Sequence, residues 1–268
     1  MKPAHPARRR KRTAALPGIC GALGALVAWA GPASASPSTG HAVAVTTSSN
    51  WSGYVATGRS YNEASGTFTV PSVSRYLARS TASEWVGVDG WSDSSLLQAG
   101  VNEVPVGHDA TLFEPWWEVV PGPQQFASGV MVRAGDRITV KVQEISAGRW
   151  SISLMDGTNG DRFSTVQRYS GQATSAEWVV EADATARGGS TELAPLAGKV
   201  TFTSATLDNA PASPGGALES GTELGSVTSS TASGLAATTF TKVVMVQGGH
   251  AVSTPSTFDG GAFSVKYS

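Results

Sequence analysis

Short segments in which apolar and polar residues alternate, or in which apolar residues run together, recur along the chain from Asn50 onward. Clusters of Gly, Ser, Pro and Asp separate them, and the chain holds 31 glycines and 14 prolines. A period of two is the pattern of a half-buried strand, and hardly any window shows the 3.6-residue period of an amphipathic helix. The predicted strands are 50–55, 64–70, 83–89, 95–101, 116–120, 128–133, 137–145, 150–156, 161–169, 176–183, 199–207, 240–246 and 262–267. Their spacing predicts an all-β sandwich or barrel.

The first 35 residues have the features of a targeting segment. A basic run at residues 8–12 precedes an apolar run at 14–30 and the sequence Ala-Ser-Ala at 33–35. This is the order of a secretory signal peptide, so we expect cleavage after Ala35 and export to the extracellular space. The apolar run is too short and too rich in glycine for a good membrane span. We therefore expect a soluble mature protein without membrane association. We also expect it to be a monomer.

Two further segments stand apart by composition. Residues 36–48 are small and polar, and we expect a short disordered leader or pro-segment there. Residues 49–268 are then expected to form a single domain. Within it, residues 209–237 are rich in Ala, Ser, Gly and Thr with hardly any large apolar residue, which predicts a long low-complexity surface excursion.

Charge and missing residues exclude several kinds of chemistry. After removal of residues 1–35 the chain keeps 13 Lys and Arg against 20 Asp and Glu, a net charge of about −7, so a basic nucleic-acid footprint is absent. Cys20, the only cysteine, lies in the predicted signal, which leaves the secreted domain without disulfides or thiol chemistry. There is no G-x-S-x-G, H-E-x-x-H, Asp-Thr-Gly or Asp-Ser-Gly sequence. His41, His108 and His250 are widely separated and give no metal-ligand spacing, so we expect neither metal nor cofactor.

Carboxylate and amide chemistry remains, and two acids stand four residues apart inside the apolar run 176–183. In a strand, the period of two puts Glu177, Val179 and Glu181 on one face, and Trp178 and Val180 on the other. A carboxylate in a half-buried sheet is costly unless it is paired, solvated or used. The face that carries Glu177 and Glu181 is therefore a candidate for function.

Three more predicted strands divide in the same way. Their polar or aromatic faces carry Trp85, Gly87 and Asp89; Gln98 and Gly100; and Trp116, Glu118 and Val120. This pattern fits a sandwich in which the outer face of one sheet is a polar groove lined by tryptophans. For any one of these side chains, an ordinary outward-facing polar residue is the simpler interpretation. In a chain with only 15% charged residues, the concentration of acids beside tryptophans favours a site.

The segments that carry these residues occur in the order found in a known family. They are Ser-Asn-Trp-Ser-Gly at 49–53, Phe-Thr-Val-Pro at 68–71, Glu-Trp-Val-Gly-Val-Asp-Gly at 84–90, Leu-Gln-Ala-Gly at 97–100, Trp-Trp-Glu at 116–118, Ala-Gly-Asp at 134–136 and Ala-Glu-Trp-Val-Val-Glu at 176–181. The ordered set resembles the glutamic peptidases, also called eqolisins or peptidase family G1. The similarity runs from about residue 49 to 207, with a weaker echo at 242–247.

The resemblance implies a β-sandwich of two large, bent antiparallel sheets, concanavalin-like or jelly-roll-like, whose concave face binds peptide. It implies an acid endopeptidase that acts on polypeptides, with Gln98 and Glu181 as the catalytic pair. Other residues match motif positions near that pair and are expected to line the groove or support the pair: Trp85, Asp89, Trp116, Glu118 and Glu177. The fungal members contain disulfides and a longer pro-segment, and in both respects this sequence departs from them.

A glutamate and a glutamine suit peptide hydrolysis in acid, where a histidine of ordinary pKa about 6.5 is already protonated. Glu181 would take a proton from the attacking water and return it to the leaving amine. Gln98, neutral at every relevant pH, would hold the water and donate to the oxyanion. For Glu177, tuning of the catalytic acid through a hydrogen bond and a direct role are equally good interpretations. The Asn50-Trp51-Ser52 glycosylation sequon is best read as a chance match.

Two other functions fit paired acids beside tryptophans. One is a glycoside hydrolase on a jelly-roll-like sandwich, which needs two carboxylates facing each other across the groove. The other is a lectin-like or cell-wall-binding module that uses the same groove without turnover. Hydrolysis of a protein or peptide at acid pH distinguishes the peptidase from both.

Overall fold

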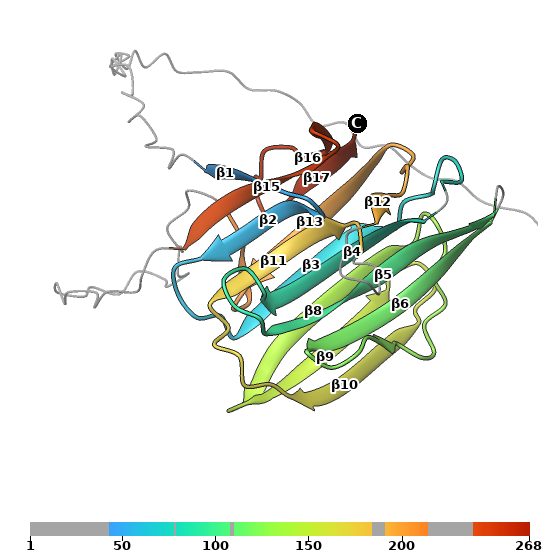
Figure 1. The fold of residues 1–268 in the computed structure, drawn as a ribbon. Coiled ribbons are helices and arrows are strands. Elements are labelled where there is room, and N and C mark those ends of the chain that lie inside the picture. The colour runs from blue at the N-terminus through green and yellow to red at the C-terminus, as the bar shows by residue number, and fades with distance from the viewer. Residues whose placement is uncertain (1–42, 78, 108–109, 184–190, 214–237) are drawn as a thin grey trace, which may run out of the picture. The chain divides into compact units, whose positions relative to one another are not determined.

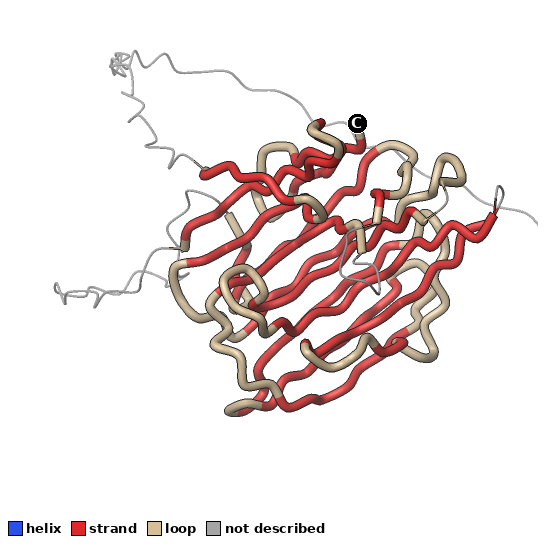
Figure 2. The backbone as a smooth tube through the Cα atoms, in the orientation of Figure 1, coloured by secondary structure: helices blue, strands red, loops and turns tan. Residues whose placement is uncertain are grey.

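The computed structural model describes residues 43–77, 79–107, 110–183, 191–213 and 238–268. Over these residues the chain forms strands, turns and loops, and no helix (Figure 2). The strands are β1 (Ala44–Ser48), β2 (Trp51–Thr57), β3 (Glu63–Thr69), β4 (Ser80–Asp89), β5 (Leu96–Gly107), β6 (Ala110–Val120), β7 (Gln125–Phe126), β8 (Arg137–Ser146), β9 (Arg149–Asp156), β10 (Arg162–Arg168), β11 (Ser175–Glu181), β12 (Glu192–Leu193), β13 (Lys199–Leu207), β14 (Ala210–Pro211), β15 (Thr239–Gln247), β16 (His250–Pro255) and β17 (Phe263–Tyr267). The predicted all-β fold is confirmed.

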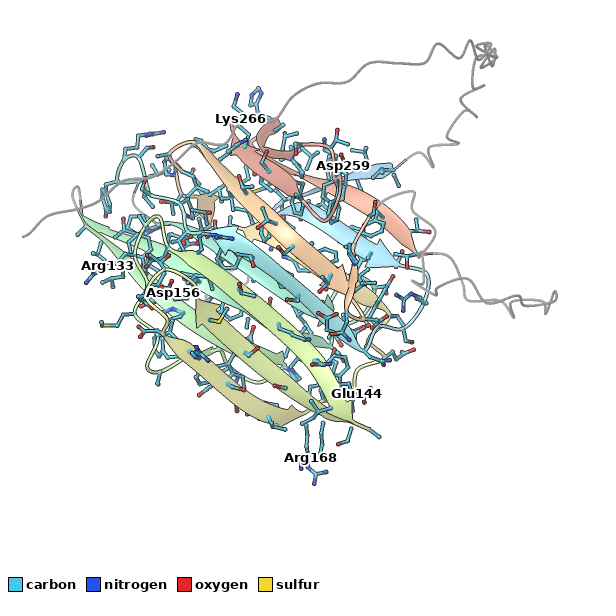
Figure 3. The ribbon with its side chains drawn as sticks, turned by 180° about the vertical axis from the view of Figure 1, so that it is seen from behind. Arg133, Glu144, Asp156, Arg168, Asp259 and Lys266 are labelled. Atoms are coloured by element: carbon cyan, nitrogen blue, oxygen red, sulfur yellow. The ribbon has the colours of Figure 1, made fainter. Side chains whose placement is uncertain are left out.

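Hydrogen-bonded strands follow one another in a single antiparallel ladder, β10-β9-β8-β3-β13-β17-β16-β15-β2-β11-β4-β5-β6-β7. Two pairs, β1 with β15 and β12 with β4, are parallel. The ladder folds back on itself. Strands β2, β11, β4, β5 and β6 form a front layer (Figure 1), and β13, β3, β8, β9 and β10 form a back layer, seen from behind in Figure 3. Two layers packed face to face are a β-sandwich.

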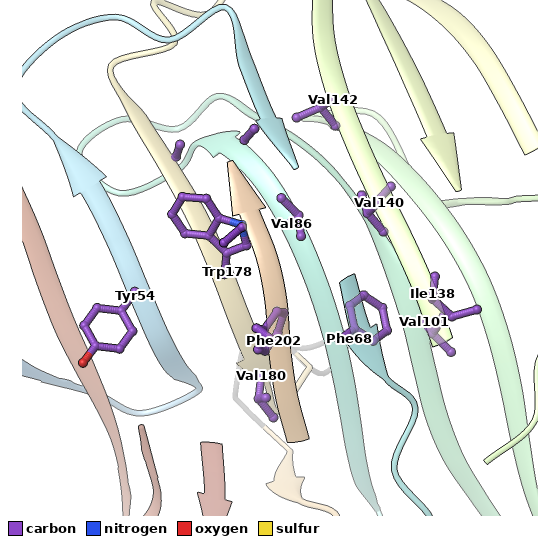
Figure 4. Packing of buried hydrophobic residues seen from close by; sticks show 14 of the residues in the cluster. Tyr54, Phe68, Val86, Val101, Ile138, Val140, Val142, Trp178, Val180 and Phe202 are labelled. Atoms are coloured by element: carbon purple, nitrogen blue, oxygen red, sulfur yellow. The ribbon is translucent and has the colours of Figure 1, made fainter. Parts of the chain in front are cut away.

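Apolar side chains from both layers fill the space between them (Figure 4). The front layer contributes Val86, Trp178 and Val180, and the back layer contributes Phe68, Ile138, Val140 and Phe202.

Trp178 links the two layers directly. It is fully buried, and its Nε1 donates to the Ser65 carbonyl of β3 at 2.8 Å. Gly66 makes room for the indole, because a Cβ there would lie 2.8 Å from Trp178 Cδ1. This contact fixes β11 against the back layer, and it thereby fixes the acids on the opposite face of β11.

The predicted strand at 128–133 is wrong. The Met131 N–H donates to Asp161 Oδ2 at 3.0 Å, and the Arg133 N–H donates to Asp136 Oδ2 at 2.8 Å. Backbone donors taken by side-chain carboxylates are not free to join a ladder. Val130 and Val132 are buried all the same, which explains the alternating pattern of this loop.

The expected disordered leader at 36–48 is corrected at its end. Residues 44–48 form β1, in register with Thr241–Met245 of β15. Val45, Thr46 and Thr47 are β-branched and suit a strand, and β15 offers them an edge that the sequence could not reveal. Strand β16 was likewise not predicted.

The predicted signal at 1–35 lies outside the described residues, as does most of the excursion at 209–237, of which Ala210–Pro211 forms β14. Within the part of the chain that the structure describes, no helix has the length and hydropathy needed to cross a membrane.

Candidate active site

The front layer has two faces of different character. Val86, Leu97 and Trp178 point into the core between the layers. Trp85, Leu96, Trp116 and Val179 form a separate cluster with Trp51 and Val120 on the opposite side, as the alternation along the strands predicted. We call this second side the site face; it carries Trp85 from β4, Gln98 from β5, Glu118 from β6 and Glu181 from β11.

Glu181, at the end of β11, is held through both carboxylate oxygens. Asn50 Nδ2 donates to Oε1 and Trp85 Nε1 donates to Oε2, each at 2.8 Å. The indole of Trp85 is itself fixed edge-on against Trp51, with ring centroids 4.9 Å apart. Both donors are neutral, so these two hydrogen bonds orient the carboxylate without adding a positive charge.

The surroundings of Glu181 make it a stronger base than an ordinary glutamate. Burial, followed by the nearby Asp183 carboxylate, raises the pKa of Glu181 to about 7, while hydrogen bonds from Trp51, Trp85 and Asn50 oppose the rise. Burial likewise raises the pKa of Asp183 to about 6, with further contributions from Glu114 and Glu118. These acids therefore share one electrostatic environment, in which each disfavours ionisation of the next.

Gln98 lies in the middle of β5, and its side chain is paired with Glu118. The two residues stand directly opposite each other in the β5–β6 ladder, and Gln98 Nε2 donates to Glu118 Oε2 at 2.8 Å. Gln98 Oε1 is buried and has no hydrogen-bond partner among the described residues. Burial raises the pKa of Glu118, and the hydrogen bond from Gln98 opposes that rise. A buried, unpartnered amide oxygen is available for a water or a substrate group.

Gln98 and Glu181 lie at two ends of the Trp85 side chain. Gln98 is opposite Gly87 on β4 and Glu181 is opposite Ser83, four residues away, which corresponds to about 13 Å along the strand. A Cβ at Gly87 would lie 2.9 Å from the Leu97 carbonyl oxygen, 3.0 Å from Gln98 Cβ and 3.2 Å from Trp85 Cζ3. The glycine therefore lets the indole and the glutamine pack together. To act on one water, the two side chains must extend toward each other over Trp85.

Glu177 shares the face of Glu181 but lies in a different environment. It is fully buried, and among the described residues neither of its carboxylate oxygens meets the geometry of a hydrogen bond. Burial raises its pKa well above the ordinary value, although the nearby Ser175 hydroxyl lowers that pKa somewhat, and Asp89 and Asp93 add to the rise. Glu177 lies opposite Gly87, level with Gln98 but two strands away. It makes no direct contact with Glu181.

Asp89, the last residue of β4, connects that strand to the segment before β11. Its Oδ2 accepts from the Tyr169 hydroxyl at 2.6 Å and from the Ala173 N–H at 2.7 Å, and its Oδ1 accepts from the Thr174 N–H at 2.8 Å. These three side-chain hydrogen bonds all come from the segment before β11, so Asp89 holds the entry to that strand.

Trp116 is buried on the site face and donates from Nε1 to the Ser83 hydroxyl at 3.2 Å. Ser83 in turn donates to Asn102 Oδ1 at 2.8 Å. This chain of polar contacts joins β6, β4 and β5 beside the position of Glu181, and gives Trp116 a packing and positioning environment.

Sequence reasoning missed Asn50, a direct partner of Glu181. Its amide is oriented by Ser48, whose hydroxyl donates to Asn50 Oδ1 at 3.1 Å. The signal was present, because Asn50 is the second residue of the Ser-Asn-Trp-Ser-Gly segment at 49–53, but the residue was given no role at the site. Asp183 was also missed as a neighbour that raises the pKa of Glu181.

Among the described residues, no group of three or more His, Cys, Asp or Glu side chains is placed to hold a metal ion, whereas His41 and His108 lie outside that part of the chain. A small pocket is lined by Glu114, Gln124, Gln125 and Phe126. It borders the site face at β6 and includes neither Gln98 nor Glu181.

The β-sandwich formed by the described residues is also found among solved structures. The structure matches that of scytalido-glutamic peptidase with a transition state analog inhibitor at a TM-score of 0.63 and 22% identity, over 83% of this chain and 100% of the other. At this identity the match establishes the fold.

The chain belongs to the Peptidase A4 family, whose family model matches residues 49–267. It is similar to aspergillopepsin-2 of Aspergillus niger, with 32% identity over 160 residues, which cover 50% of this chain and 56% of the relative. It is also similar to scytalidopepsin B of Scytalidium lignicola, with 29% identity over 159 residues, which cover 57% of this chain and 59% of the relative. The matches thus span less than two thirds of the length of either relative.

Proposed function

We propose that this protein is a secreted endopeptidase that hydrolyses peptide bonds in acid with Glu181 and Gln98 as its catalytic pair. The observation that carries the proposal is the state of Glu181: a desolvated carboxylate whose oxygens accept hydrogen bonds from the neutral side chains of Asn50 and Trp85. Such a group keeps its orientation and gains basicity. Membership in a peptidase family supports the reaction class.

In the proposed mechanism, Glu181 takes a proton from a water molecule as the water oxygen attacks the carbonyl carbon of the scissile peptide. An ionised carboxylate has about four acceptor positions, so its bonds to Asn50 and Trp85 leave room for the water. The NH₂ group of Gln98 donates to the oxyanion that forms on the carbonyl oxygen. Glu181 then gives its proton to the amide nitrogen, the carbon–nitrogen bond breaks, and a carboxylic acid and an amine are released.

The raised pKa of Glu181 sets the expected pH range. With a pKa of about 7, about a tenth of the molecules carry the ionised base at one pH unit below that value. The rate should therefore rise with pH toward 7. A glutamate of ordinary pKa would work as a base in strong acid. With its raised pKa, Glu181 is proposed to work in weak acid.

The remaining parts of the proposal concern the context of the reaction. We infer export through the signal at 1–35, a short leader that ends before β1, a single peptidase domain made of β1 and residues 49–268, and a monomer that acts on polypeptides without a cofactor. The acidic balance of the chain supports the inference that nucleic acids are not partners.

The test uses protein expressed from the full chain and purified after export, incubated with casein and, separately, with a β-glucan at weakly acid pH. New amino termini in casein, lost in Glu181→Gln and Gln98→Glu but kept in the surface variant Glu144→Gln, are the expected result. Release of sugars in place of peptides would identify a glycoside hydrolase. Binding of glucan without cleavage of either polymer would identify a binding module.

A further inference from the structure

The Gln98 amide has two ends of nearly equal shape and opposite hydrogen-bonding character. Its NH₂ can only donate, and its oxygen can only accept. A rotation of the amide by half a turn would therefore replace one function by the other with little change in packing. For Gln98 to take a defined part in a reaction, something must fix the orientation of its amide.

Glu118 is well placed to do this. It lies directly opposite Gln98 in the β5–β6 ladder, so backbone hydrogen bonds determine its position. On its other side, β6 pairs with β7 through Trp116 and Trp117. The Trp116 side chain is anchored in turn by the Ser83 hydroxyl of β4.

The chemistry of the contact selects one amide orientation. An ionised carboxylate accepts hydrogen bonds and has none to donate, so it admits only the NH₂ end of the amide. The observed bond has this polarity, from Gln98 Nε2 to Glu118 Oε2 at 2.8 Å. One Nε2 hydrogen is used in this bond and the second is left for a ligand. Oε1 is left buried, with no partner in the part of the chain that the structure describes.

We propose that Glu118 is the positioning residue that fixes the Gln98 amide, with Nε2 toward β6 and Oε1 free to accept a hydrogen bond from the attacking water. This inference rests on the proposed function for its consequence in catalysis, but the orientation itself does not depend on it. Protonation of Glu118 would let its own hydroxyl donate to Oε1, and the constraint on the amide would be lost.

Three other carboxyl groups belong to the same electrostatic cluster as Glu118: Asp183, just after β11, interacts with Glu114 and Glu118 of β6 and also with Glu181 of β11. Gln98 hydrogen-bonds to none of them, whereas it bonds directly to Glu118. A pH-dependent signal from the Gln98 amide that disappears with the Glu118 carboxyl group therefore reports Glu118 and not its neighbours.

The orientation can be tested without an activity assay, by nuclear magnetic resonance of the ¹⁵N-labelled protein. The Gln98 side-chain NH₂ signals are identified by their loss in Gln98→Glu. Between about pH 3 and pH 7 they should follow a titration in the wild type and in the surface variant Glu144→Gln, and stay constant in Glu118→Gln. Wild-type signals that do not move, or that move equally in Glu118→Gln, would overturn the proposal.

Kinetics give the second test. In Glu118→Gln, whose side chain can donate as well as accept, kcat should fall about 10- to 100-fold with KM nearly unchanged. The acid limb of log(kcat/KM) should become less steep, because one of two required ionisations is lost. Glu118→Asp, which keeps the carboxylate, should recover part of the rate. Unchanged kcat and slope in Glu118→Gln would overturn the proposal, whereas a wild type without peptidase activity would refute the proposed function and leave the resonance test decisive.

Discussion

A pair of carboxyl groups buried in the core predicts that this fold loses stability as the pH rises to neutrality. Glu84 of β4 and Glu103 of β5 are both fully buried, and neither is part of the proposed mechanism. Glu84 lies opposite Val101, and Glu103 lies opposite Ala82, so the two acids are diagonal neighbours across the ladder. Two ionised carboxylates have no donor to share, and their oxygens find a partner only when one of them is protonated.

The magnitude follows from the pKa of Glu84, which burial raises from 4.5 to about 8. Burial, with the Glu84 charge adding to it, also raises the pKa of Glu103. Above pH 4.5 the folded state thus binds more protons than the unfolded state, so the free energy of unfolding falls as pH rises. The contribution of Glu84 to this fall is complete once the pH passes about 8. Because pH 7 lies 2.5 units above the unfolded pKa of 4.5, Glu84 lowers the free energy of unfolding at pH 7 by about 3 kcal/mol. That is a large share of the 5–15 kcal/mol typical of a domain.

The informative variant is Glu84→Gln, which keeps the shape of the protonated acid and cannot ionise. Its NH₂ group can also donate to Glu103. We expect it to be within about 1 kcal/mol of the wild type at pH 4 and about 3 kcal/mol more stable at pH 7. Urea unfolding followed by tryptophan fluorescence, at several pH values, measures both differences.

The matched control is Glu144→Gln, which removes a partly exposed carboxylate from β8 and should keep the pH dependence of the wild type. If the free energy of unfolding of Glu84→Gln falls with pH as steeply as that of the wild type, the buried pair is not the cause and the reasoning is refuted.

Three further substitutions test the site and its support. Trp85→Phe removes a donor from the ionised form of Glu181, worth about 1.5–3 kcal/mol, so the acid limb of kcat/KM should move up by about 1–2 pH units; an unmoved limb would separate Trp85 from catalysis. Asp89→Ala leaves three donors without their acceptor and should lower the free energy of unfolding by about 3–5 kcal/mol in urea, and a loss below 1 kcal/mol would contradict that role. Gly87→Ala places a Cβ 3.0 Å from Gln98 Cβ and should lower kcat about 10- to 100-fold at nearly constant KM, whereas full activity would show that the glutamine tolerates displacement.

The alternation of side chains made the faces of the central strands predictable. Because the period of a strand is two, the positions of Trp178 and Val180 fixed those of Glu177 and Glu181 without knowledge of the partner strands. The same reasoning failed at 128–133, where buried valines alternate in a loop whose N–H groups bond to Asp136 and Asp161. Alternation shows which side chains are buried, but a segment forms part of a sheet only where a neighbouring strand accepts its backbone hydrogen bonds.

The contacts within the site depend on long-range pairing and were less accessible. Asn50 meets Glu181 across 131 residues of sequence, and Gln98 meets Glu118 because β5 turns back as β6. Glu84 shares its side of β4 with Val86 and Val88, so its burial in the core followed from the same alternation. The sequence could not show that Glu103 of the next strand would lie beside it.

The central claim is that Glu181 and Gln98 act on the same reacting carbonyl although their backbones are about 13 Å apart along the strands. The most direct measurement is a crystal structure of the protein with a peptide whose scissile bond is replaced by a tetrahedral transition-state analogue. The account predicts one analogue oxygen at about 2.7–3.2 Å from the Glu181 carboxylate and a hydrogen bond from Gln98 Nε2 to the same tetrahedral group. An analogue bound in the site with either side chain more than about 5 Å from that group would contradict it.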